Sequence, residues 1–217
     1  LSPRVMNVMP GDAGYPAEIE ITLPENMLAI PFGSSAAEVV AEHEDGTRTW
    51  RYEHNGAGGI LYAGDYIRED IEAGGMTIQF YYGHKHQAVM EAAKAVDAVK
   101  EVVDYCTEHY GSLSFGTGET LKLIQSRVAG GGYATTGASL LDEADFTAAN
   151  LGNTEKGGGA GEVMIHELVH QWWGLGNMFD VADETSPWSS EGLTVYTTYR
   201  IVKELYGEDY ARELGAR

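Results

Sequence analysis

The chain has 217 residues, enough for one large domain or two smaller ones with a buried core. Its formal net charge is −19, from 14 Lys and Arg against 33 Asp and Glu, which argues against nucleic acid or an anionic membrane surface as a partner. No apolar run approaches the length of a membrane span, so we expect no direct membrane contact by this segment.

The first part of the chain, residues 1–83, is predicted to be β-structure. Residues 17–23 alternate apolar and polar side chains, and residues 76–82 are rich in the side chains that strands favour. Residues 39–52 contain Glu44-Asp45-Gly46-Thr47, which indicates a hairpin turn between two further strands.

Residues 87–110 are predicted to be helical, because their apolar side chains recur every three, four or seven positions. Gly111 supplies a C-terminal stop. Cys106, the only cysteine, falls on the apolar face, where we expect a small core residue and not a nucleophile. The change from strand to helix predicts a domain boundary near Gly83, with a second domain at residues 84–217.

After this helix, short strands are predicted at residues 120–125 and 138–141, and a loop at residues 150–161. Between the strands lies Gly131-Gly-Tyr-Ala-Thr-Thr-Gly137. On their own, its glycines indicate no more than a tight turn or bulge.

The next segment contains His166-Glu167-Leu168-Val169-His170, the pattern HExxH. On a helix, residues four apart lie on one face, so the imidazoles of His166 and His170 can converge on one metal ion. Glu167 lies beside them and could take a proton from a water. The flanking residues are mostly apolar, and buried His and Glu are costly without partners, which a metal would supply. The alternative is a solvated helix whose histidines align by chance.

A second segment, Trp188 to Tyr196, begins another apolar-periodic stretch, with Ser189 or Ser190 as N-cap and Glu191 in the first turn. Catalytic zinc commonly takes three protein ligands, and two His with one Glu is a known set. Glu191 is therefore the best candidate for the third ligand of one Zn²⁺ per chain. The alternative is that Glu191 only favours the positive end of its helix.

The first block resembles the gluzincin aminopeptidases of the aminopeptidase N (membrane alanyl aminopeptidase) type, whose pattern is HELxHQWFG. The match includes Gln171, Trp172 and Gly174. In the second block the family has WLNEGFAxY. The residues that match are Trp188, Glu191, Gly192 and Tyr196, and Ser190 stands where the family has Asn. Residues 171–190 place 20 residues between the second His and Glu191, against about eighteen in the family.

The resemblance implies an α+β fold and a zinc peptidase. Residues 1–83 would be the C-terminal part of a β-sheet domain. Residues 84–217 would be the first part of a thermolysin-like catalytic region, with a small mixed sheet and zinc-binding helices. The implied reaction removes N-terminal residues from peptides through a zinc-activated water, with Glu167 as general base. The chain is expected to be a piece of a longer polypeptide and to lack robust turnover alone, because the family's oxyanion-stabilising Tyr would follow Arg217.

The resemblance also assigns a substrate-binding strand edge. The family has GxMENxG where this chain has residues 131–137, so the backbone of a peptide would lie along four residues, Gly131, Gly132, Tyr133 and Ala134. Ala134 replaces the family's Glu, which binds the free α-amino group of the substrate. Either another acid such as Asp142 or Glu143 binds that amine, or the protein is a gluzincin endopeptidase.

One alternative function and one structural question stay open. A non-catalytic peptide-binding module could keep the same fold without hydrolysing peptides. The groups that orient the histidines are not fixed by the sequence, and the acidic residues nearest along the chain are Asp180, Asp183 and Glu184.

Overall fold

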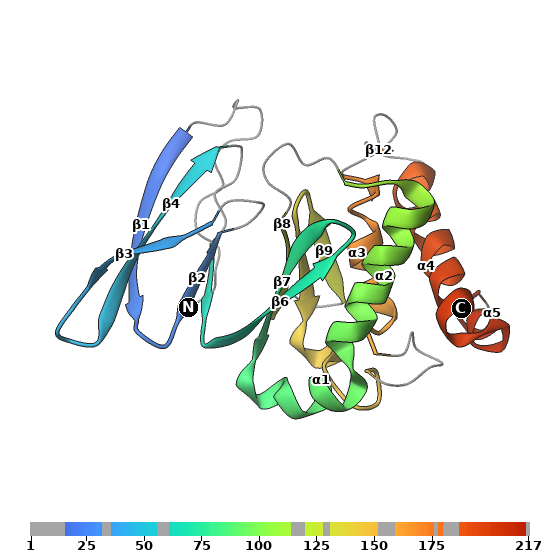
Figure 1. Cartoon of the computed structure of the whole chain (residues 1–217), viewed down its shortest axis with the longest axis horizontal. Helices are drawn as coiled ribbons and strands as arrows, with labels where there is room; N and C mark the ends of the chain where they lie inside the picture. Colours follow the sequence, from blue (N-terminus) through green and yellow to red (C-terminus); the bar gives the residue numbers. More distant parts are fainter. Residues whose placement is uncertain are drawn as a thin grey trace. The chain divides into compact units, whose positions relative to one another are not determined.

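A computed structural model of the chain describes residues 16–31, 36–55, 61–113, 120–127, 131–151, 159–175, 178–179 and 187–215. The fold is mixed α+β, with several small sheets followed by helices, as the sequence predicts (Figure 1). It divides into two compact units, residues 1–66 and 67–217, which we describe separately.

The first unit consists of two small antiparallel sheets. In one, the strands are ordered β1-β4-β3, with β1 at Pro16–Pro24, β3 at Glu38–Glu42 and β4 at Thr47–Asn55. In the other, β2 at Leu28–Pro31 pairs with β5 at Leu61–Gly64. The predicted hairpin turn is confirmed between β3 and β4. There the Asp45 carboxylate accepts hydrogen bonds from the Thr47 N–H at 3.1 Å and from its hydroxyl at 2.7 Å.

The second unit is built on a five-stranded sheet with the order β6-β7-β8-β10-β9. Its strands are β6 at Tyr66–Ala73, β7 at Met76–Gly83, β8 at Thr120–Ser126, β9 at Gly132–Thr135 and β10 at Ala138–Asp142. Strands β7, β8 and β10 run parallel, whereas β9 runs antiparallel to β10 and forms an edge of the sheet. The strands predicted at 120–125 and 138–141 are confirmed.

The predicted domain boundary near Gly83 stays a prediction; the two compact units divide at Tyr66 and Ile67. The physical reason is strand pairing: β7 joins β8 in parallel register, with Phe80 opposite Leu123, and both side chains are fully buried. That the two units correspond to the end of a β-sheet domain and to a thermolysin-like catalytic region stays a prediction.

The helices of this unit are α1 at Gln87–Ala93, α2 at Ala95–Tyr110, α3 at Glu162–Val169, α4 at Glu191–Tyr206 and α5 at Glu208–Gly215. Helix α3 contacts β9 and β10 of the five-stranded sheet, and the other helices pack beside it or follow one another in contact, α2 and α4 with α3 and α5 with α4. Figure 1 shows α2, α3 and α4 side by side, and their buried side chains share one apolar cluster with β7 and β8. Cys106 is buried there, as expected for a core residue, and burial raises the pKa of its thiol. Gly111 ends α2 as predicted.

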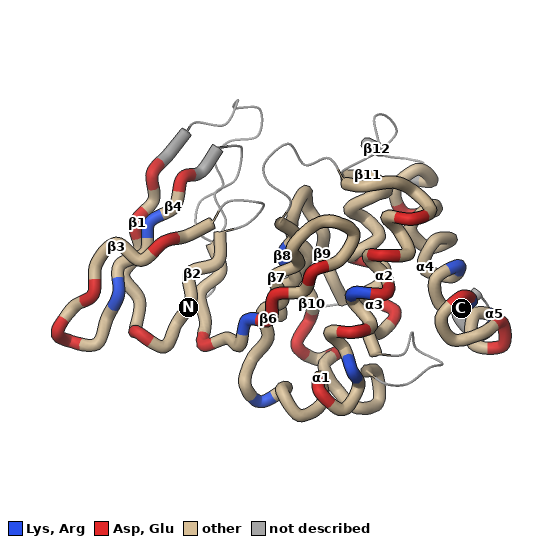
Figure 2. Tube along the Cα trace, in the orientation of Figure 1, with Lys and Arg blue, Asp and Glu red and all other residues tan. Residues whose placement is uncertain are grey.

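The acidic residues are distributed over both units. Figure 2 shows Asp and Glu on strands and helices throughout the described chain, with Lys and Arg scattered singly among them. Among the described helices, not one has the length and hydropathy that a membrane span requires.

Candidate metal centre

Helix α3 brings the HExxH residues together because residues four apart lie on one face, while another face enters the apolar core. Met164, Ile165 and Leu168 are at most 3% exposed and belong to the apolar core. The opposite side carries His166, and the helix ends at His170, whose N–H donates to the carbonyl of His166 at 3.1 Å. The prediction that this motif lies on a helix is confirmed.

Helix α4 brings the third acidic candidate to the same place. Ser190 is the N-cap residue, as expected, and Glu191 is the first residue of the helix. The His166 Nε2 and His170 Nε2 atoms lie 3.0 Å apart. The Glu191 carboxylate oxygens lie 3.2 Å from Nε2 of His166 and 3.3 Å from Nε2 of His170.

This donor set fits a zinc ion. Zinc–ligand bonds of about 2.0–2.1 Å in a tetrahedral site place neighbouring ligand atoms roughly 3.3 Å apart. The two Nε2 atoms lie near that separation, and each has one of the two Glu191 oxygens at a similar distance. The structure thus brings the predicted ligands, His166, His170 and Glu191, into a group that could hold a metal.

The hydrogen bond at Nδ1 of His170 leaves Nε2 as the nitrogen that can bind a metal. The Nδ1 atom lies 3.2 Å from the carbonyl oxygen of Trp173, which can only accept, so Nδ1 carries the proton and Nε2 keeps its lone pair. The hydroxyl of Thr194 on α4 also lies 3.2 Å from this Nδ1. The sequence alone did not identify either partner, since one is a backbone atom and the other is 24 residues away. The candidates Asp180, Asp183 and Glu184 lie outside the described residues.

Burial shapes the protonation of the site. Glu167 is 7% exposed, and burial, followed by the charge of Glu191, raises the pKa of its carboxyl to about 7. A bound cation would favour its charged form. Burial and the neighbouring His170 lower the pKa of His166, which keeps its imidazole neutral and able to donate a lone pair to a metal.

Gly132 on β9 has no room for a side chain. A Cβ built there would lie 2.2 Å from Cγ of Glu167, far below van der Waals contact. Because Gly132 lacks that atom, the carboxylate of Glu167 lies directly against the backbone of the edge strand. The resemblance pointed to this glycine, but only the structure gives this reason for it.

The metal group and the predicted substrate edge share one open pocket of about 270 Å³. Its lining residues come from β9, α3 and the start of α4, namely Gly132, Tyr133, Ala134, His166, Glu167, His170, Leu175, Ser190 and Glu191. Gly131 lies just outside; a Cβ there would meet Cγ1 of Val163 at 3.8 Å.

In the part of the chain that the structure describes, no strand pairs with the second edge of β9. The Asp142 N–H donates to the Gly131 carbonyl at 2.8 Å, and hydrogen-bonded pairs alternate along an antiparallel ladder. The backbone N–H and C=O groups of Gly132 and Ala134 therefore face away from β10, towards the open edge. Side chains two apart share a face, so Ala134 lies on the same side of the strand as Gly132 and faces α3.

The two acids considered as alternatives at Ala134 do not line this pocket. Asp142 caps the short 3₁₀ helix Glu143–Asp145 by accepting from the Ala144 N–H at 3.0 Å. Glu143 pairs with Lys85 at 2.9 Å and with Arg127 at 3.2 Å.

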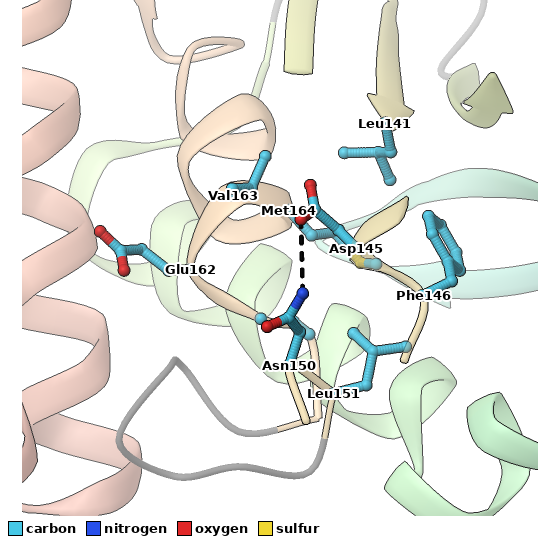
Figure 3. A pocket seen from close by; sticks show the side chains of 10 residues that line it. Leu141, Asp145, Phe146, Asn150, Leu151, Glu162, Val163 and Met164 are labelled. Atoms are coloured by element: carbon cyan, nitrogen blue, oxygen red, sulfur yellow. Dashed lines mark hydrogen bonds between the residues drawn. The ribbon is translucent and has the colours of Figure 1, made fainter. Parts of the chain in front are cut away.

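A separate cavity of about 190 Å³ lies at the N-terminal end of α3 (Figure 3). Figure 3 shows Asn150 donating to Asp145 at its wall, over a distance of 3.4 Å. The other walls are mainly apolar, from Leu141, Phe146, Leu151, Ala160, Val163 and Met164. This cavity shares no lining residue with the metal pocket.

The solved structures most similar to the chain include several M1 zinc metallopeptidases. A two-domain M1 mutant bound to L-arginine has a TM-score of 0.59 and 19% identity, covering 91% of this chain and 43% of that one. The enzyme from Deinococcus radiodurans has a TM-score of 0.55 and 19% identity, with 91% and 42% covered. A mutant of it bound to the substrate Tyr-Ser-Ala has a TM-score of 0.54 and 18% identity, with 91% and 43% covered.

Comparison with protein-family models and with curated protein sequences gave no match. The chain spans 43% of the length of the first of these structures. At this level of identity the likeness concerns the fold: the chain shares part of the M1 zinc metallopeptidase fold, and within that fold it has a His-His-Glu group that could bind a metal.

Proposed function

We propose that this chain carries the zinc centre of a peptidase, with His166, His170 and Glu191 as metal ligands and Glu167 as general base. The observation that carries the proposal is the meeting of two imidazole Nε2 atoms 3.0 Å apart, each within 3.3 Å of an oxygen of Glu191, beside the buried acid Glu167. The shared fold supports it, and so do related structures that hold amino acids or a peptide.

When bound, a zinc ion would polarise a scissile carbonyl and make a water more acidic. The protein's own groups do the rest. His170, oriented by the Trp173 carbonyl, presents a lone pair to the metal. Glu167, held against Gly132, accepts a proton from water and returns it to the departing amine.

The open edge of β9 is suited to hold the peptide. An extended peptide pairs with a free strand edge through main-chain hydrogen bonds. The outward-facing groups of Gly132 and Ala134 lie in the metal pocket itself, so a peptide paired there would run past the ligand group.

Zinc content and hydrolysis test the proposal separately. We expect near-stoichiometric zinc by elemental analysis, lost in His166→Ala and in Glu191→Ala. Glu167→Gln should retain zinc but reduce peptide hydrolysis by the protein at least about a hundredfold. Glu162→Gln, on the first turn of the same helix, is the matched control and should leave both unchanged.

Zinc retained without Glu191 would contradict the ligand assignment. Hydrolysis unchanged by Glu167→Gln would contradict the peptidase. A chain that binds zinc and peptide but never cleaves would be the non-catalytic peptide-binding module.

The choice between aminopeptidase and endopeptidase rests on the amine. Among the described residues that line the pocket, the only acids are Glu167 and Glu191, which we assign as base and ligand. A free α-amine beside a metal dication needs a carboxylate to offset their repulsion. Removal of N-terminal residues is the reaction the resemblance implies, but Ala134 favours an endopeptidase as the second candidate.

Comparison of N-acetylated and free peptides of one sequence separates the two. An aminopeptidase cleaves only the free form, whereas an endopeptidase cleaves both. Ala134→Glu adds the missing charge on the side of β9 that faces α3, and should shift the preference towards free peptides about tenfold or more. Ala134→Gln, of similar size but neutral, should not.

A further inference from the structure

We infer that Gln171 is a positioning residue that holds the β9 edge at a fixed offset from the metal ligands. This inference rests on the proposed function, since it concerns how the same pocket receives a peptide. Gln171 follows His170 directly. Its polar side chain is fully buried among neighbours in sequence that are mostly apolar.

The Gln171 amide binds the turn between β9 and β10 at several points. Its Oε1 accepts from the N–H of Gly137 at 3.0 Å. Its Nε2 donates to the carbonyl of Thr135 at 2.9 Å and lies 3.2 Å from the hydroxyl of Ser139. Both ends of the amide are thus used, and only a side chain with a donor and an acceptor can replace them.

A second contact continues the connection to the metal helix. The Ser139 hydroxyl, also fully buried, donates to the carbonyl of Glu167 at 2.9 Å. The hairpin is therefore fastened to α3 at Glu167 and to the residue after His170. These two attachments lie next to the general base and a metal ligand, so they set the distance from the strand edge to both.

The open edge needs such a connection because, among the described residues, β9 pairs with a strand on one side only. Its four residues pair with β10, and the peptide-facing groups of Gly132 and Ala134 are on the unpaired side. A hairpin free to shift by about 1 Å would misplace a paired peptide relative to the metal and cost about a hundredfold in rate. Fastening the hairpin to α3 limits that shift.

The test uses zinc-loaded chain carrying Glu167→Gln, so that peptides bind without being cleaved. Gln171→Met keeps the volume and removes both hydrogen-bonding ends. We expect unchanged zinc content and faster amide exchange at Gly137. Tetrapeptide affinity should be about tenfold weaker, whereas a dipeptide, which makes few edge contacts, should bind within about twofold of the parent.

Gln125→Met is the matched control. Gln125 is likewise buried, and its amide binds the Gly83 N–H at 2.8 Å and the His86 ring, on a strand away from the metal pocket. It should destabilise the fold in a similar way without changing the dependence of affinity on peptide length.

The outcomes are distinct. Equal weakening for dipeptide and tetrapeptide, loss of zinc, or unchanged exchange at Gly137 would overturn the positioning role. Failure of the parent chain to bind any peptide would overturn the proposed function and, with it, the peptide role of Gln171. Length-dependent weakening confined to Gln171→Met supports it.

Discussion

At the scale of single residues, Gly174 controls where the third ligand lies. Its backbone has φ +97°, and a Cβ there would lie 2.4 Å from Oγ of Ser190. Ser190 is the N-cap of α4 and precedes Glu191. A side chain at position 174 would therefore push the start of α4 and its carboxylate away from the histidines.

Gly174→Ala should lower zinc affinity about tenfold, measured by competition with a chromophoric chelator. Gly207→Ala is the control, because its φ of +101° is similar but a Cβ there meets nothing within 4 Å. Both variants carry backbone strain, but only Gly174→Ala also crowds Ser190, so only that variant should weaken zinc binding. Equal zinc affinity in the two variants would refute the displacement of Glu191.

Lys122 is a buried base on β8, 2% exposed. Burial, and then the charge of Arg68, lower its pKa from 10.5 to about 8. Between these values the unfolded chain binds more protons than the folded chain, so raising the pH through this window adds stability. Below pH 8 the charged ammonium stays a cost to folding.

The stability gained from about pH 8 to 10.5 should amount to roughly 3 kcal/mol at most. In Lys122→Met this gain should be absent, as measured by urea unfolding at a series of pH values. Lys100→Met removes a half-exposed lysine instead, and this variant should keep the gain in stability between pH 8 and 10.5. A gain of the same size in both variants would mean that Lys122 titrates normally.

At the scale of elements, one residue divides the helix predicted at 87–110. Lys94 has φ +52° and ψ +43°, the left-handed conformation, and separates α1 from α2. A side chain in that conformation costs about 1–2 kcal/mol relative to the right-handed helix. The surrounding contacts must stabilise the break enough to exceed that cost.

Lys94→Gly should raise the free energy of unfolding by about 0.5 kcal/mol, because glycine adopts a positive φ without strain but loses more chain entropy on folding. Lys94→Ala keeps the Cβ and should give no such gain. The midpoint of urea unfolding measures both. A stabilisation shared by the two would point to the lysine charge instead of the backbone.

Most strands and the metal helix follow from local signals. Alternation, turn residues and helical periodicity identified β1, β7, β8, β10 and the helix of the HExxH motif. The break at Lys94 escaped prediction because lysine has no preference for a positive φ. The division into compact units at Tyr66 and Ile67 could not be predicted, because β7 has the same alternation as earlier strands and its pairing with β8 depends on distant residues.

Part of the candidate site could likewise be predicted from the sequence, and part could not. His166, Glu167 and His170 are recognisable from spacing alone, and Glu191 follows from the start of the next helix and the known ligand set of two His and one Glu. The Trp173 carbonyl and the contacts of Gln171 involve backbone atoms or partners far along the chain. No sequence pattern encodes those contacts directly, so the structure was needed to find them.

At the scale of the molecule, the proposed ligands join two helices of the second unit. His166 and His170 belong to α3 and its C-cap, and Glu191 begins α4. A metal that binds the folded arrangement and not the unfolded chain stabilises the part that carries its ligands.

Zinc should therefore increase amide protection in α3 and α4 more than in the sheet formed by β1, β3 and β4. Hydrogen exchange followed by mass spectrometry, with and without one equivalent of zinc, measures this. His166→Ala should remove the difference. Equal protection in both units would indicate nonspecific binding to the acidic surface.

The three proposed ligand side chains differ widely in their access to solvent. That of Glu191 is 54% exposed, against 23% for His166 and 10% for His170. Rotation of one exposed carboxylate therefore opens the group to bulk water while both imidazoles stay in place. An ion held by the proposed ligands would therefore exchange with solution by rotation of the Glu191 side chain and dissociation of that ligand, without global unfolding.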